Sequence, residues 1–411
     1  MSRLMKNILI FLPLFLLSCM SSHSYLNKKY LQHGQELAHR FIITDGHVDL
    51  PWRLNTKNFR LEREFLAIPV QSNEGDFDYV RAKAGGLSAP FMSIFIPASF
   101  QNDLPSARVE ADKLIDMVNG IIEAHPDKFA KGDSPEMIEA NFKKGLISLP
   151  MGLENGAPIA ALDDVAYFFE RGIRYVTLTH GKDNHISDSS YDTTHTWNGL
   201  SPFGIKLIDE MNRVGMMVDV SHISDGAFFK VMEVSEAPVI ASHSSCRAFT
   251  PGWERNMSDE MIKLLGEKGG VIMINFGSDF LDAAVAKTRT ENRIELEKKL
   301  NDANLKADDP AAKPIIEEFK KDHPDLYSDV EKVADHMDHV RKIAGIDHIG
   351  IGSDFDGVGD SLPTGLKDVS MYPNLIAELL SRGYSESDIE KICYKNVWRV
   401  WHQVSEIAQR G

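Results

Sequence analysis

The sequence predicts a closed barrel of eight parallel β-strands with helical crossovers, the (β/α)8 or TIM barrel of the α/β class. Three observations support this prediction. Eight short apolar runs, rich in β-branched residues, can be counted along the chain. Amphipathic stretches with helical period lie between most of them, as in parallel sheets. Residue types that bind metals end several of the runs, and active sites of such barrels are built where the strands end.

The predicted strands come in a regular order with helices between them. They span residues 41–48, 91–97, 146–154, 174–180, 215–222, 238–243, 269–276 and 348–355. Helical patterns cover residues 107–124, 162–171, 204–213 and 257–268. A doubly wound open sheet uses the same units, but eight strands with reactive residues at so many ends favour closure.

Length and charge indicate one large domain with a solvated surface. With 411 residues and 43% hydrophobic content, the chain can form one barrel with insertions. We expect this single domain at residues 41–411, with a charged helical insertion at about 277–324. The net charge of -15 comes from acidic residues scattered along the chain, which argues against nucleic acid as a partner.

The N-terminal segment 1–19 has the order of a bacterial export signal. Basic residues precede the apolar run ILIFLPLFLL, which is too short for an ordinary membrane span. The tetrad LLSC ending at Cys19 resembles a lipobox, in which the cysteine carries lipid; a plain signal peptide is the alternative. We expect a lipid on Cys19 as the membrane attachment, a polar tether at 20–40, and a location at the cell envelope facing the periplasm.

Side chains of the types that bind metals stand at the ends of the predicted strands. They are His47, Asp49, Glu154, His222, His243 and Asp354. Because the carboxyl ends of the strands meet at one rim, these residues are expected to share a pocket. Carboxylates and imidazoles suit zinc or a similar divalent ion, and two ions that share a carboxylate form a hydrolytic site.

The local sequence around His47, Asp49 and Glu154 is consistent with metal binding. His47 and Asp49 lie on the same side of an extended strand, so both could bind one ion. Asp45 shares that face and is expected to orient the His47 imidazole. A carboxylate at Glu154 is costly to desolvate alone and is stabilised between two cations. For each residue a purely structural role is the alternative: a core histidine, or a loop acid paired with a lysine.

Other polar residues near the strand ends are candidates for substrate chemistry. His180 could stabilise an oxyanion, and Asp354 could take a proton from the attacking water and return it to the leaving nitrogen. Arg255, in the sixth βα loop, could hold a substrate carboxylate, although a surface arginine is the default. Asp356 is expected to orient its loop. No GxSxG, P-loop or HExxH motif is present, so serine catalysis and a single-site zinc protease have no support.

Several short motifs together resemble one family. DGHVD, GLENG, YVTLTH, GLSPFG, VDVSH, SHSSCR, RN and GIGSDFDGV occur in the order seen in the membrane (renal) dipeptidase family, peptidase family M19. The resemblance extends from about Asp45 to the C-terminal region. It differs at Asn155, where many relatives have glycine, and in the polar C-terminal tail, where mammalian relatives carry a lipid-anchor signal.

The resemblance implies a binuclear zinc dipeptidase on an amidohydrolase-like barrel. Two Zn²⁺ ions per subunit would be bridged by Glu154 and a hydroxide. His47 and Asp49 would complete one zinc site, and His222 and His243 the other.

The resemblance also implies the substrate and the assembly. His180 would contact the peptide oxygen, Arg255 would hold the C-terminal carboxylate, and Asp354 would handle the proton. Small dipeptides, including some with a C-terminal D-residue, would be the substrates of a homodimer.

Two other functions stay open at the level of sequence. Another metal-dependent amidohydrolase, acting on a cyclic amide, lactone or acyl-amino acid, would keep the metals and change the carboxylate contact. A non-enzymatic periplasmic metal-binding lipoprotein would saturate its ions with protein ligands. Three protein ligands for each ion favour catalysis over the second alternative.

Overall fold

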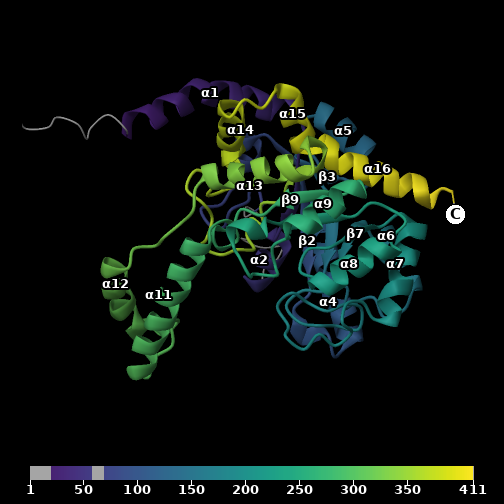
Figure 1. The fold of residues 1–411 in the computed structure, drawn as a ribbon, viewed down its shortest axis with the longest axis horizontal. Coiled ribbons are helices and arrows are strands. Elements are labelled where there is room, and N and C mark those ends of the chain that lie inside the picture. Colours follow the sequence, from purple (N-terminus) through teal and green to yellow (C-terminus); the bar gives the residue numbers. More distant parts are fainter. Residues whose placement is uncertain (1–19, 58–68, 411) are drawn as a thin grey trace, which may run out of the picture.

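The computed structural model of the chain describes residues 20–57 and 69–410 and has a closed barrel at its centre (Figure 1). The barrel strands are β1 (Ile43–Val48), β2 (Leu87–Phe95), β5 (Met151–Glu154), β6 (Ile173–Thr177), β7 (Met217–Asp219), β8 (Ile240–Ser244), β9 (Val271–Ile274) and β10 (Ile349–Ile351). Their order around the barrel is β1-β10-β9-β8-β7-β6-β5-β2, and all neighbours are parallel. The predicted (β/α)8 barrel is confirmed, and each predicted strand overlaps one barrel strand.

One predicted strand is divided between two sheets. Residues 146–154 form β4 (Ile147–Leu149) and β5, with Pro150 between them. Proline has no N–H to donate to a ladder, so it marks the break. β4 pairs with β3 (Phe129–Lys131) in a separate two-stranded sheet, and only β5 joins the barrel.

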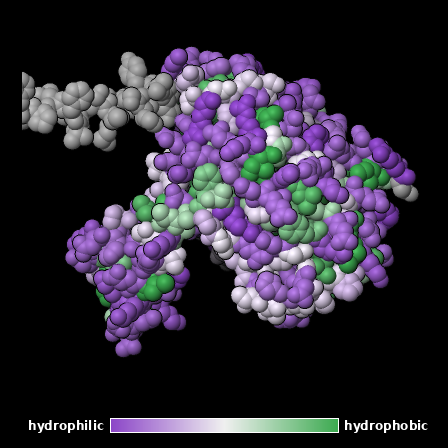
Figure 2. Space-filling model, in the orientation of Figure 1, coloured by the Kyte–Doolittle hydropathy of each residue, from purple (hydrophilic) through white to green (hydrophobic). Residues whose placement is uncertain are grey.

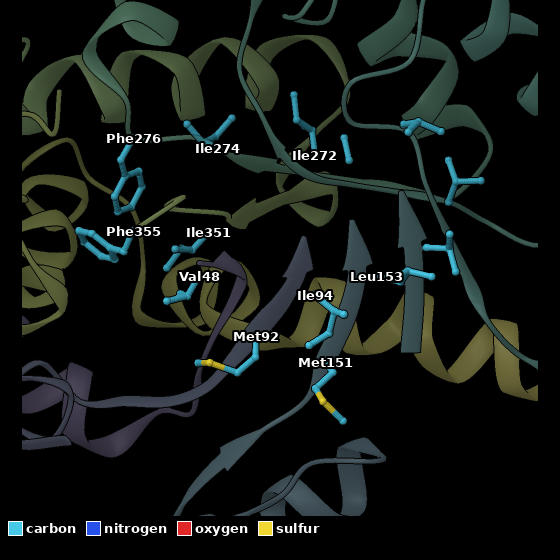
Figure 3. Close-up of a cluster of buried hydrophobic side chains, with 14 of the residues drawn as sticks. Val48, Met92, Ile94, Met151, Leu153, Ile272, Ile274, Phe276, Ile351 and Phe355 are labelled. Carbon is cyan, nitrogen blue, oxygen red and sulfur yellow. The ribbon is translucent and has the colours of Figure 1, made fainter. Parts of the chain in front are cut away.

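Helices surround the strands and connect them. They are α2 (Leu50–Thr56), α3 (Tyr79–Gly85), α4 (Leu104–Ala124), α5 (Pro135–Lys143), α6 (Asp163–Glu170), α7 (Pro202–Val214), α8 (Asp225–Val234), α9 (Asp259–Glu267), α13 (Val330–Ile343), α14 (Tyr372–Ser381), α15 (Glu386–Glu390) and α16 (Asn396–Ala408). Serine side chains cap the N-termini of α7, α8 and α9 by accepting a backbone N–H. Barrel side chains such as Ile94, Leu153 and Ile351 lie in the larger buried apolar cluster (Figure 3).

The segment expected to be a tether is a helix, α1 (Met20–Arg40), which packs against α14 (Figure 1). Leu37 and Ala38 are fully buried. A side chain at Gly34 would come within 2.5 Å of the Pro373 carbonyl oxygen, so glycine permits the close approach of the two helices. The expectation of a tether was wrong because a few buried side chains suffice to dock a helix whose other positions are polar.

The predicted signal peptide at 1–19 and its Cys19 lie outside the described residues. Within residues 20–57 and 69–410, no helix is both long and apolar enough to cross a membrane.

The charged segment after β9 extends away from the barrel (Figures 1 and 2). It begins with the short α10 (Ser278–Leu281) and continues through α11 (Ala283–Asp302) and α12 (Lys313–Asp322). We call residues 283–322 the arm. Along α11, oppositely charged side chains pair at helical spacing, as in Lys287 with Glu291 and Arg293 with Glu297.

Candidate metal centre

The eight site residues predicted from the sequence meet at the carboxyl rim of the barrel. Six of them line one cavity of about 590 Å³: Asp49, Glu154, His180, His222, His243 and Asp354. The other two, His47 and Arg255, are buried and contact this group. Residues from six barrel strands or the loops that follow them therefore converge, as parallel strands in a closed barrel require.

Glu154 lies between His47 on one side and His222 and His243 on the other. Its Oε2 atom is 3.3 Å from His47 Nε2 and accepts a hydrogen bond from Ser93 Oγ. Its Oε1 atom is 3.2 Å from His222 Nε2 and 3.3 Å from His243 Nε2. Burial opposes ionisation of this carboxyl, but the nearby imidazoles hold its pKa well below the usual value. Each oxygen of one ionised carboxylate thus faces a different set of nitrogen atoms.

The His47 imidazole is held from below by Tyr175. The Tyr175 hydroxyl lies 2.9 Å from His47 Nδ1 and donates to the Gly46 carbonyl, so its oxygen accepts from Nδ1–H. This leaves His47 Nε2 facing Asp49 Oδ2 at 3.4 Å and Glu154. Tyr175 fits there because Gly152 has no side chain: a Cβ atom would lie 2.0 Å from the tyrosine ring.

Asp45 does not orient this imidazole, contrary to expectation. Its Oδ1 accepts the backbone N–H groups of His47 and Ser353, at 3.1 and 2.9 Å. The Tyr372 hydroxyl donates to its other oxygen. Asp45 therefore fixes the backbone at the ends of β1 and β10, while Tyr175 fixes the ring.

His222 and His243 form the second group. Their Nε2 atoms are 2.8 Å apart. Ser242 Oγ donates its hydrogen to Asp219, so it accepts a hydrogen bond from His243 Nδ1–H. The Nε2 atom of His243 therefore carries no hydrogen, and its lone pair is free. Burial holds the pKa of both imidazoles well below the usual value, and the nearby Arg255 acts in the same direction. Neutral imidazoles of this kind are metal ligands.

Several buried polar atoms around Glu154 lack a hydrogen-bond partner among the described residues. Two of them are atoms of candidate ligands, His47 Nε2 and Asp49 Oδ1. Buried polar atoms are normally paired, so orphaned ligand atoms fit a site for a cation. Three overlapping groups have ligand atoms within 4.8 Å of one another: His47, Glu154 and His243; Glu154, His180 and His222; His47, Asp49 and Asp354. All five predicted ligands fall in these groups, which also contain His180 and Asp354.

Arg255 is buried behind the cavity wall. It is 2% exposed, and its guanidinium donates to Ser244 Oγ and to the His243 carbonyl, both at 2.8 Å. It also lies 3.1 Å from His222 Nε2, with the Phe280 ring centred 5.2 Å away. This cation belongs to the rim and not to the outer surface.

His180 and Asp354 also line the cavity. His180 Nε2 is 3.6 Å from Glu154 Oε1, and burial lowers the pKa of this imidazole. Asp354 has a left-handed backbone (φ 63°), donates its N–H to the His47 carbonyl, and accepts from Asn275 Nδ2 at 2.7 Å. Burial, with Asp49 and Glu154 nearby, raises the pKa of Asp354 to about 7. A carboxyl of this kind can exchange a proton near neutral pH.

Asp356 and three further buried residues outside the metal centre, His336, Cys246 and Cys393, have structural surroundings. Asp356 accepts from Arg53 and from the Asp76 backbone, which fixes the loop after β10. His336 is buried and bonds to the Cys246 N–H and the Leu281 carbonyl. The thiols of Cys246 and Cys393 are free and buried.

The supporting residues Tyr175, Asp219 and Asn275 were missed in the sequence. Each lies on a barrel strand or one residue beyond its end, within an apolar run. A polar atom in such a run was the available signal, because buried polar groups need partners.

Comparisons with known proteins agree with this geometry. The family model described as membrane dipeptidase (peptidase family M19) matches residues 31–411. Dipeptidase tcpJ of Claviceps purpurea is 32% identical over 377 residues, covering 89% of this chain and 78% of that protein. The crystal structure of the probable dipeptidase PvdM from Pseudomonas aeruginosa superposes with a TM-score of 0.76 at 26% identity, covering 93% of this chain and 100% of that one. A metallo peptidase from Rhodobacter sphaeroides, liganded with a phosphinate mimic of L-Ala-D-Ala, shares the fold with a TM-score of 0.70 at 24% identity, covering 89% and 99%.

Proposed function

Because the chain belongs to the membrane dipeptidase family, peptidase family M19, and is a metallo-dipeptidase, we propose that it hydrolyses dipeptides with two zinc ions. The observation that carries this proposal is the setting of Glu154. One buried carboxylate has one oxygen turned to His47 and the other turned to His222 and His243. A carboxylate in this position can bridge two cations, whereas a single ion would use only one set.

The residues divide into two ligand sets that share Glu154. His47 and Asp49 would hold one zinc ion with Oε2, and His222 and His243 would hold the other with Oε1. The tautomers support this division, since Tyr175 and Ser242 bind the Nδ1 atoms of His47 and His243 and leave Nε2 free. Three protein ligands leave room for water or substrate at each ion.

When bound, the zinc ions would polarise the peptide carbonyl and activate the water that attacks it. Asp354 accepts the proton of that water and passes it to the amine nitrogen as the peptide bond breaks. Asn275 holds the Asp354 carboxylate in place through its hydrogen bond to Oδ2. His180, at the cavity wall, donates to the peptide oxygen as its negative charge develops.

Arg255 would bind the free C-terminal carboxylate of the dipeptide. It is the buried cation beside the His222 and His243 set, and a guanidinium matches a carboxylate in geometry and charge. A carboxylate this close to the scissile bond selects short substrates. The ligand of the Rhodobacter sphaeroides metallo peptidase, a mimic of L-Ala-D-Ala, supports tolerance of a D-residue at the C-terminal position.

We further propose that the mature protein is a homodimer at the cell envelope, attached through a lipid on Cys19 and facing the periplasm. The basic, apolar and small residue order before Cys19 supports export and lipidation. Labelling of the full chain with a radioactive fatty acid in a bacterial host tests the lipid attachment directly. Cys19→Ser should remove the label and release the protein from the membrane fraction. A Cys19→Ser protein that keeps the label and stays in the membrane fraction would contradict the proposed attachment.

Metal-dependent cleavage tests the catalytic proposal. The protein starting after Cys19 is stripped of metal, and hydrolysis of L-Ala-L-Ala, L-Ala-D-Ala and tri-alanine is measured with and without zinc. We expect zinc to restore cleavage of both dipeptides but not of the tripeptide, and elemental analysis to find two zinc ions per chain. Folded, zinc-loaded protein that cleaves no dipeptide would refute the proposal. One zinc ion at full activity would refute the binuclear part alone.

A further inference from the structure

Tyr191 lies at the mouth of the active-site cavity, next to the buried Arg255. Its side chain lines the cavity and is 42% exposed. Its ring centroid is 5.8 Å from that of His222, whose Nε2 atom lies 3.1 Å from the Arg255 guanidinium. This residue was not predicted from the sequence, because it lies in the polar loop between β6 and α7.

The loop that carries Tyr191 is tied to two site residues. The Ser190 N–H donates to the His222 carbonyl at 2.8 Å. Ser189 Oγ donates to the His180 carbonyl and accepts the Tyr191 N–H at 3.1 Å. These bonds place the tyrosine relative to the candidate metal centre, although its ring is partly in solvent.

We propose that Tyr191 binds substrate, donating its hydroxyl to the C-terminal carboxylate of the dipeptide beside Arg255. This inference rests on the proposed function and adds a second group to the carboxylate site. Arg255 is a donor only, and a phenol O–H can also donate, so both groups can bind one carboxylate. An acceptor that carries negative charge completes this arrangement better than a neutral amide does.

The protonation state of Tyr191 fits this role. An ordinary tyrosine phenol loses its proton only near pH 10. The hydroxyl therefore stays protonated at neutral pH and can donate. A phenolate would repel the substrate carboxylate.

Aromatic rings lie beside Arg255 on the side of Tyr191. Trp253 lies between Tyr191 and Phe280, with ring centroids 6.3 and 4.8 Å away, and Phe280 covers the Arg255 guanidinium. A substrate carboxylate beside Tyr191 and Arg255 would therefore lie next to these rings.

The test compares Tyr191→Phe with wild type on L-Ala-L-Ala and on its C-terminal amide, the latter as substrate or competitive inhibitor. Loss of one charge-assisted hydrogen bond should raise KM for the free acid about tenfold, equivalent to about 1.4 kcal/mol, and leave kcat within about twofold. The constants for the amide should stay unchanged. Tyr167→Phe is the matched control, because its hydroxyl donates to Asp112 away from the cavity.

The outcomes separate the two proposals. An unchanged KM for the free acid, or an equal change for acid and amide, would overturn the role of Tyr191. Failure of wild type to cleave the dipeptide would instead refute the proposed function. A thermal melt of each variant shows that the fold is intact, and Tyr191→Leu should raise KM for the acid at least as much as Tyr191→Phe.

Discussion

The barrel rim and the arm at residues 283–322 both carry many charged side chains, but in opposite settings. At the rim, Glu154 is 3% exposed and contacts imidazoles that come from three other strand ends. In the arm, Arg293 and Glu297 are one helical turn apart, and each side chain is more than half exposed. Charge density therefore does not mark the site. Burial and convergence from distant parts of the chain do, because desolvated charges need specific partners.

This contrast predicts where substitutions act. When a buried group at the rim loses its charge, the oppositely charged groups around it lose their partner. When one member of an exposed ion pair is removed, water solvates the other member. Matched substitutions in the two regions should therefore differ strongly in effect.

Glu154→Gln should have the largest effect. The amide keeps the shape but removes the charge that both proposed zinc sites share, so we expect a loss of dipeptidase activity on the order of 10³-fold or more. Kinetics and elemental analysis of bound zinc measure it. The matched control is Glu297→Gln in the arm, which should keep wild-type activity and metal content. Similar activities for the two variants would contradict the comparison.

Asp354→Asn should come next. Asparagine preserves the size of the side chain but cannot accept the proton of the attacking water, so kcat should fall by about 10² to 10⁴. Bound zinc should remain at the wild-type level, which distinguishes this variant from Glu154→Gln. Loss of zinc together with activity would show that Asp354 is a metal ligand and not the proton acceptor.

His336 extends the comparison to a buried group outside the rim. Burial lowers its pKa from 6.5 to about 4, so the unfolded chain binds a proton in this range and the folded chain does not. The free energy of unfolding keeps its full value, as far as His336 is concerned, above pH 6.5. It falls as the pH drops from 6.5 to about 4, by at most about 3 kcal/mol.

Urea unfolding between pH 7 and 4 measures this effect. His336→Gln should show a shallower loss of stability toward acid than wild type. Equal pH dependence in the two proteins would show that His336 is not the responsible group.

Arg293→Ala should have the smallest effect. Its exposed pair with Glu297 contributes less than about 0.5 kcal/mol, so the free energy of unfolding and kcat/KM should both stay close to wild type. A loss of activity here would show that the arm takes part in catalysis.

The barrel could be predicted because each strand is a short apolar run separated from the next by a helical pattern. The same criteria failed where the signal was weaker. The three-residue β3 is too short to show a period, and Pro150 divides a run that reads as one strand. Helix α1 is polar along most of its length and depends on contacts with α14, which the local sequence does not contain.

The site could be predicted in its parts but not in its contacts. Strand-end positions identified the side chains that converge, because parallel topology brings those ends together. Which atom faces which neighbour depends on side chains from other strands. Asp45 was therefore given the role that belongs to Tyr175, and Tyr191 was overlooked in a loop without an apolar pattern.

The tyrosine beneath His47 has a consequence for laboratory evolution of new substrate ranges. Libraries usually vary loops at the mouth of a pocket, but here the floor also determines activity. A single methyl group at Gly152 would collide with the Tyr175 ring and, through its hydroxyl, displace the His47 imidazole. Loop residues such as Tyr191 can be varied in such libraries. Gly152 and Tyr175, in contrast, limit how far the interior of the barrel can be repacked without loss of activity.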